Sequence, residues 1–163
     1  MTRRGVSHHL ATEEGVYGVI LVAGMIVASG THATAVWEVF TAVVVTVVVF
    51  WAAHVYAATV AHHGARNGHT LTLGAALRHA LNRSLGLLVS ALIPTSILLL
   101  GVAHIVDDAT AVWAALWAGV VVLAVIGFLT YRSRGSSAWI CILGAASTAG
   151  FGIVMILLKA ALH

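Results

Sequence analysis

The amino-acid sequence predicts an all-α, polytopic membrane protein with five transmembrane helices and a short amphipathic helix before the third. Two observations predict this fold class. Of the 163 residues, 61% are hydrophobic and only 8% are charged, whereas soluble domains carry about 25% charged residues. The hydrophobic residues also gather in long runs, and about 20 such residues suffice for a helix to cross a bilayer. We therefore expect residues 1–163 to form a single transmembrane domain.

Five apolar segments cover most of the chain. The expected spans are residues 15–31, 36–61, 84–105, 111–130 and 138–158. Glu13 and Glu14 directly precede the first segment, which suits a cleaved signal peptide poorly, so we expect this segment to remain as a helix. Between the second and third segments, residues 70–83 place leucines on one helical face and basic residues on the other. This pattern is typical of an amphipathic helix, which lies on the membrane surface or leads directly into the next span.

Small residues at four-residue spacing indicate where two helices pack closely. The sets are Ala53, Ala57 and Ala61 in the second segment and Gly144, Thr148 and Gly152 in the fifth. We expect the fifth helix to pack against the others through its small face.

The third segment contains the one proline of the chain, Pro94. Proline removes the helical hydrogen bond to the carbonyl four residues earlier, here that of Ser90. The hydroxyls of Ser90, Thr95 and Ser96 lie near enough in sequence to compensate. We therefore predict a bend with Pro94 and Ser90 as its hinge. The alternative is a static kink without a gating role.

His54 is the foremost candidate for function, because it lies inside the second apolar segment. An ionisable side chain within a span is costly to bury and is by default a functional hypothesis. Histidine also changes its charge near neutral pH, which suits the handling of protons or ions. The alternative is a neutral histidine that is hydrogen-bonded to a neighbouring helix and helps it to pack.

Glu13, Glu14 and Tyr17 form a second candidate group at the start of the first segment. If the chain crosses the membrane five times, they lie on the same side as the nearer end of the helix that carries His54. Glu14 then has four candidate partners, which are Arg66, Arg78, Arg83 and His54. The alternative is interfacial charge pairing, with an acid placed favourably at a helix N-terminus.

Other functional classes lack support in the sequence. We find no nucleophile or phosphate-loop motif and expect no enzyme activity. The ten histidines show no metal-ligand spacing, and a single cysteine, Cys141, rules out a CxxC site, so we expect no metal and no cofactor. A net charge of +3 without a basic stripe gives no indication of nucleic-acid binding.

The string VFWAAHVYA at residues 49–57, with Tyr17-Gly18 in the first segment, resembles a group of small bacterial integral membrane proteins of similar length. That group has no assigned activity, so the resemblance implies a bacterial inner membrane location and transfers no site.

All seven arginines fall on one side of the membrane if five spans are counted, and Lys159 falls on the other. By the positive-inside rule, the N-terminus is then cytoplasmic and the C-terminus lies outside.

Two functions remain from these observations. The first is a small channel or carrier for protons or another small ion, in which His54, Tyr17 and Glu14 handle the ion and several copies surround a pore. The second is a non-catalytic membrane scaffold or accessory subunit that acts through helix packing, to which the small-residue stripes are equally suited. A lipid- or haem-handling protein ranks below both. The expected partners are the lipid bilayer, further copies of the chain and a small ion.

Overall fold

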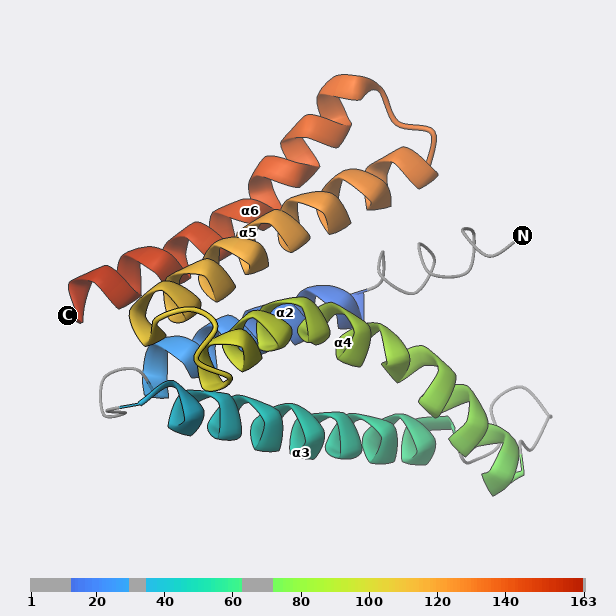
Figure 1. Ribbon diagram of the computed structural model, residues 1–163. Helices are drawn as coiled ribbons and strands as arrows, with labels where there is room; N and C mark the ends of the chain where they lie inside the picture. The colour runs from blue at the N-terminus through green and yellow to red at the C-terminus, as the bar shows by residue number, and fades with distance from the viewer. Residues whose placement is uncertain (1–12, 30–34, 63–71, 163) are drawn as a thin grey trace.

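The computed structural model describes residues 13–29, 35–62 and 72–162. Within these ranges the chain forms helices and no strands, which confirms the all-helical prediction there. The helices are α2 (Glu13–Ser29), α3 (Val36–His62), α4 (Leu73–Val102), α5 (Asp108–Ser133) and α6 (Ala138–Ala161) (Figure 1). The predicted cytoplasmic residues Arg3, Arg4 and Arg66 lie outside the described ranges.

Four of the helices are long and apolar enough to cross a membrane, and these are α3, α4, α5 and α6. This supports the prediction of a membrane protein. α2 is equally apolar in character but has only 17 residues. At about 1.5 Å per residue it is roughly 25 Å long, slightly less than the hydrocarbon core of about 30 Å.

α2 contacts each of the other four described helices, as α5 also does. The remaining helices form two antiparallel hairpins, α3–α4 and α5–α6, which meet at one end of the molecule and diverge towards the other (Figure 1). We call these the narrow end and the wide end. α2 begins at the wide end and finishes at the narrow end, between the two hairpins.

The amphipathic helix expected before the third span is not a separate element. Residues 73–83 form the first part of α4, which continues through 30 residues to Val102. No proline separates the amphipathic part from the apolar part, because Pro94 lies further along. Backbone hydrogen bonding therefore propagates through the junction at little cost.

Pro94 is buried inside α4, and Figure 1 shows that α4 changes direction along its length. The nearby hydroxyls do not donate to the Ser90 carbonyl in the structure. Thr95 Oγ1 donates to the Ala91 carbonyl at 2.7 Å, and Ser90 Oγ donates to the Leu87 carbonyl at 3.0 Å. Such bonds to the preceding turn are common for serine and threonine in apolar helices and often bend them. The hinge role of Pro94 and Ser90 stays a prediction.

α5 and α6 approach closely through small residues, as expected for the small face of the fifth segment. A Cβ atom on Gly127 would lie 2.5 Å from the Gly144 carbonyl oxygen, and one on Gly152 would lie 2.8 Å from Val120 Cγ2. Thr148 Oγ1 donates across the interface to the Leu123 carbonyl at 2.8 Å. The opposite face of α6 remains exposed, so this helix is packed on one side only.

Two aspartates organise the narrow end. Asp107 Oδ2 accepts a hydrogen bond from the Thr110 amide at 2.8 Å and so caps α5. Asp108 Oδ2 accepts from the Val36 amide at 3.0 Å and ties α5 to the start of α3. Both contacts satisfy amide groups that a helix N-terminus leaves free. The nearby His104 adopts a left-handed backbone conformation with φ of 55° after α4 has ended.

Asp107 predicts a pH dependence of stability. Hydrogen bonds from Thr110 hold the pKa of this carboxyl below its ordinary value of 3.8. A lowered pKa in the folded state means that the stabilisation is complete above pH 3.8 and is lost as the pH falls through the folded value. We expect the wild-type protein to lose more thermal stability between pH 6 and pH 3 than Asp107→Asn, which keeps the cap without the charge. Equal losses in circular-dichroism melts would contradict this assignment.

Candidate functional site

The best-defined polar contact inside the helical bundle joins α2 to α4 at the wide end. Arg83 Nε donates to Glu14 Oε1 at 2.5 Å, and the two groups form an ion pair. The Glu14 side chain is 1% exposed, whereas that of Arg83 is 48% exposed. The carboxylate is therefore enclosed between helices, and the guanidinium leads from it towards the surface.

Glycine brings the two helices close enough for this pair to form. A Cβ atom on Gly18 would lie 2.5 Å from the Leu87 carbonyl oxygen and 2.6 Å from Ser90 Oγ. The backbones of α2 and α4 thus touch one helical turn beyond Glu14, and only glycine leaves room for them. Both helices begin at the wide end, so an acid at the start of α2 meets a base near the start of the apolar part of α4.

Two buried polar atoms have no hydrogen-bond partner within the described ranges, and they are Ser84 Oγ and Trp51 Nε1. Ser84 follows Arg83 directly and is 0% exposed. α3 and α4 run antiparallel with Val36 against Gly101, and counting 15 residues from that contact on each helix brings Trp51 level with Gly86, about 3 Å along α4 from Ser84. A buried hydroxyl without a partner costs about 1–3 kcal/mol. This part of the bundle therefore holds two polar atoms whose hydrogen-bonding capacity is unused among the described residues.

The structure places His54 at the edge of the contact between α3 and α4. Its ring is half-buried and stacks on Phe50, with ring centroids 6.4 Å apart and planes inclined by 24°. In the described part of the chain, no hydrogen bond joins it to α2 or α4, so the expected contact is not formed. The reason is rotational. The buried face of α3 carries Val55 and Thr59, and His54 is turned about 100° away from Val55 around the helix axis.

Tyr17 is 53% exposed and points away from the packed face of α2. Among the described residues it forms no hydrogen bond with His54. The predicted group is therefore brought together only in part, since Glu14 is the member that gains a defined partner. Among the candidate partners of Glu14 that the structure describes, Arg83 forms an ion pair with it, and Arg66 lies outside the described residues.

Sequence reasoning offered Arg83 only as one of several partners and gave no role to Ser84. A usable signal was present, because Glu14 stands immediately before the first apolar segment and Arg83 immediately before the third. Segments of the same orientation begin at the same membrane face, so residues at these two positions share a depth. The burial of Ser84 has no comparable signal in the sequence.

No cluster of three or more His, Cys, Asp or Glu side chains suited to a metal ion occurs among residues 13–29, 35–62 and 72–162. Comparisons of the chain with protein-family models, with curated proteins and with solved structures find no match. The resemblance seen at residues 49–57 thus stays a prediction.

Proposed function

We propose that this protein is a small channel or carrier of the bacterial inner membrane that moves protons or another small ion. The single observation that supports it most directly is the enclosed carboxylate of Glu14, paired with a half-exposed Arg83 at the boundary of a transmembrane bundle. Carboxylates and other ionisable groups within membrane bundles commonly mark ion or proton pathways.

The proposal includes five spans, with α2 as the first. The described arginines, Arg78, Arg83, Arg132 and Arg134, belong to the wide end, and Lys159 belongs to the narrow end. The positive-inside rule then makes the wide end cytoplasmic, with the N-terminus inside and the C-terminus outside. Glu14 and Arg83 accordingly lie at the cytoplasmic entry of the bundle.

In the proposed mechanism, Glu14 exchanges a proton with cytoplasmic water beside Arg83. A protonated Glu14 loses its charge and attracts the guanidinium less, so the contact between α2 and α4 loosens at the wide end. The unpartnered Ser84 hydroxyl is then the next group along α4 that can donate to or accept from an entering water. His54 and Tyr17 remain proposed secondary sites at the same end.

Assembly of several copies would complete a pore that one protomer lacks. Ala53, Ala57 and Ala61 form an exposed stripe on α3, which none of the five described helices covers. His54 borders this stripe, so packing of a second α3 there moves His54 from lipid into the interface. The same stripe equally supports the second candidate function, a scaffold or accessory subunit that acts only through helix packing.

Proton flux into liposomes separates the two functions. We expect the reconstituted protein to dissipate a pH gradient faster than protein-free liposomes do. Glu14→Gln should reduce this flux towards the protein-free level, because an amide cannot take up the proton. Arg134→Gln removes an exposed charge outside the site and serves as the control for a change of charge. Absence of flux with the folded wild-type protein would contradict transport and favour the scaffold. The scaffold function is tested by crosslinking, which should join copies of the wild-type protein more efficiently than copies of Ala57→Leu.

A further inference from the structure

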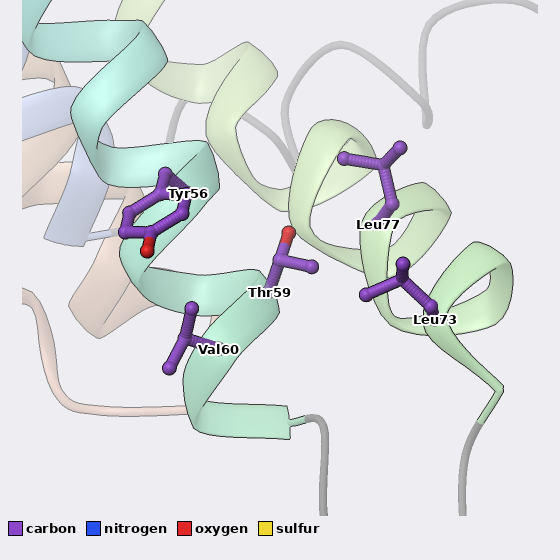
Figure 2. Close-up of a pocket in the computed structure, with 5 residues that line it drawn as sticks. All are labelled: Tyr56, Thr59, Val60, Leu73 and Leu77. Carbon is purple, nitrogen blue, oxygen red and sulfur yellow. The ribbon is translucent and has the colours of Figure 1, made fainter.

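An open apolar groove lies at the wide end between the end of α3 and the start of α4. Its volume is about 310 Å³, and it is lined by Tyr56, Thr59, Val60, Leu73 and Leu77. Figure 2 shows Leu73 and Leu77 on α4 beside Thr59 of α3, with Tyr56 and Val60 further round α3. The hydroxyl of Thr59 donates to the Val55 carbonyl of its own helix at 2.7 Å, so it presents little free polarity to the groove.

The lengths of the helices place this groove at a membrane boundary. Val36 and Gly101 touch at the narrow end. From that contact, about 20 residues at 1.5 Å each cross the hydrocarbon core and reach Tyr56 on α3 and Leu81 on α4. The groove residues therefore lie at the inner edge of the hydrocarbon and in the headgroup layer. Tyr56, 72% exposed, stands where tyrosines of membrane proteins concentrate.

The two helices that line the groove carry no acidic residue near it, and Glu14 at the wide end belongs to α2 and pairs with Arg83. Between Glu38 and Asp107 the sequence contains no acidic residue. Arg78 is exposed beside Leu77, and within the described ranges no ion pair or hydrogen bond is formed by its guanidinium. An unpaired arginine in the headgroup layer attracts anionic lipid, whereas the apolar walls below it accept methylene groups.

We propose that this groove binds one anionic phospholipid, with the first part of an acyl chain between α3 and α4 and the phosphate at Arg78. Tyr56 lies on the same rim and offers its hydroxyl to the glycerol or phosphate oxygens. The proposal is independent of ion transport, because neither Glu14 nor Arg83 takes part. A bound lipid would join two helix ends that diverge from the α5–α6 hairpin at the wide end.

The test is lipid binding to the purified protein in detergent, measured by native mass spectrometry. Phosphatidylglycerol should bind more tightly than phosphatidylcholine with the same chains. Arg78→Gln should weaken phosphatidylglycerol binding about fivefold, which corresponds to about 1 kcal/mol for one basic residue near the headgroups. Arg134→Gln, an equally exposed arginine on the α5–α6 side, should leave it unchanged.

The apolar part is tested by filling the groove. Leu73→Trp should lower phosphatidylglycerol binding, whereas Leu143→Trp, at an exposed leucine of α6, should not. Water-soluble glycerol 1-phosphate should not compete, because it has no acyl chain. Equal losses in Arg78→Gln and Arg134→Gln would show diffuse surface attraction and overturn the proposal. Competition by glycerol 1-phosphate, or unchanged binding in Leu73→Trp, would overturn it as well.

Discussion

Gly18→Ala is expected to destabilise the protein by about 1–3 kcal/mol, the range found for overpacked cores. The added methyl group meets the Leu87 carbonyl oxygen at 2.5 Å, and a backbone atom cannot turn aside as a side chain can. Helix propensity alone predicts the opposite sign, since alanine favours a helix by about 1 kcal/mol over glycine. The steric term decides because α2 and α4 must separate to admit the methyl group. Gly18→Leu should abolish the folded state.

Gly24→Ala is the matched control on the same helix, because no atom lies within 4 Å of a Cβ built there. Thermal unfolding in detergent should show this variant to be as stable as wild type or more stable. If Gly18→Ala and Gly24→Ala unfold at the same temperature, α2 and α4 do not cross at Gly18.

Arg83→Gln is expected to destabilise the protein much more than Glu14→Gln. Removing one partner of a buried ion pair costs about 3–5 kcal/mol when an enclosed charge remains behind. Glu14 is the enclosed partner and Arg83 is half-exposed. Loss of the arginine therefore removes this contact from an enclosed carboxylate, whereas loss of the acid removes it from a half-exposed guanidinium. An ion-pair contact at an exposed group contributes about 1 kcal/mol or less.

The double variant Glu14→Gln/Arg83→Gln should be more stable than Arg83→Gln alone, because it removes the enclosed charge together with its Arg83 contact. Chemical unfolding of the wild type, both single variants and the double variant gives the coupling energy directly. Equal costs for the two single variants, with no recovery in the double variant, would mean that burial does not govern this contact. This measurement is separate from flux, so a structural role and a transport role of Glu14 can be distinguished.

The helices were predictable because their signal is local. A run of apolar residues defines a membrane helix through its own length and composition, and the boundaries at Val36 and Ala138 agree with the predicted starts of their spans. The junction at residues 83–84 was predicted less well, because a change from amphipathic to fully apolar composition does not interrupt backbone hydrogen bonding. The close packing of Gly144 and Gly152 followed from their spacing, which repeats on one helical face.

The sequence by itself predicted helices and no strands, which the described residues confirm, and segments long and apolar enough to cross a membrane, and it selected Glu14 and His54 as the groups to examine. Only the tertiary structure decided which arginine meets Glu14 and that His54 turns to the edge of α3. Those outcomes depend on the depth and rotation of each helix relative to its neighbours. Depth and rotation are set by contacts between residues far apart in the chain, such as Gly18 against Leu87, and no local pattern records them.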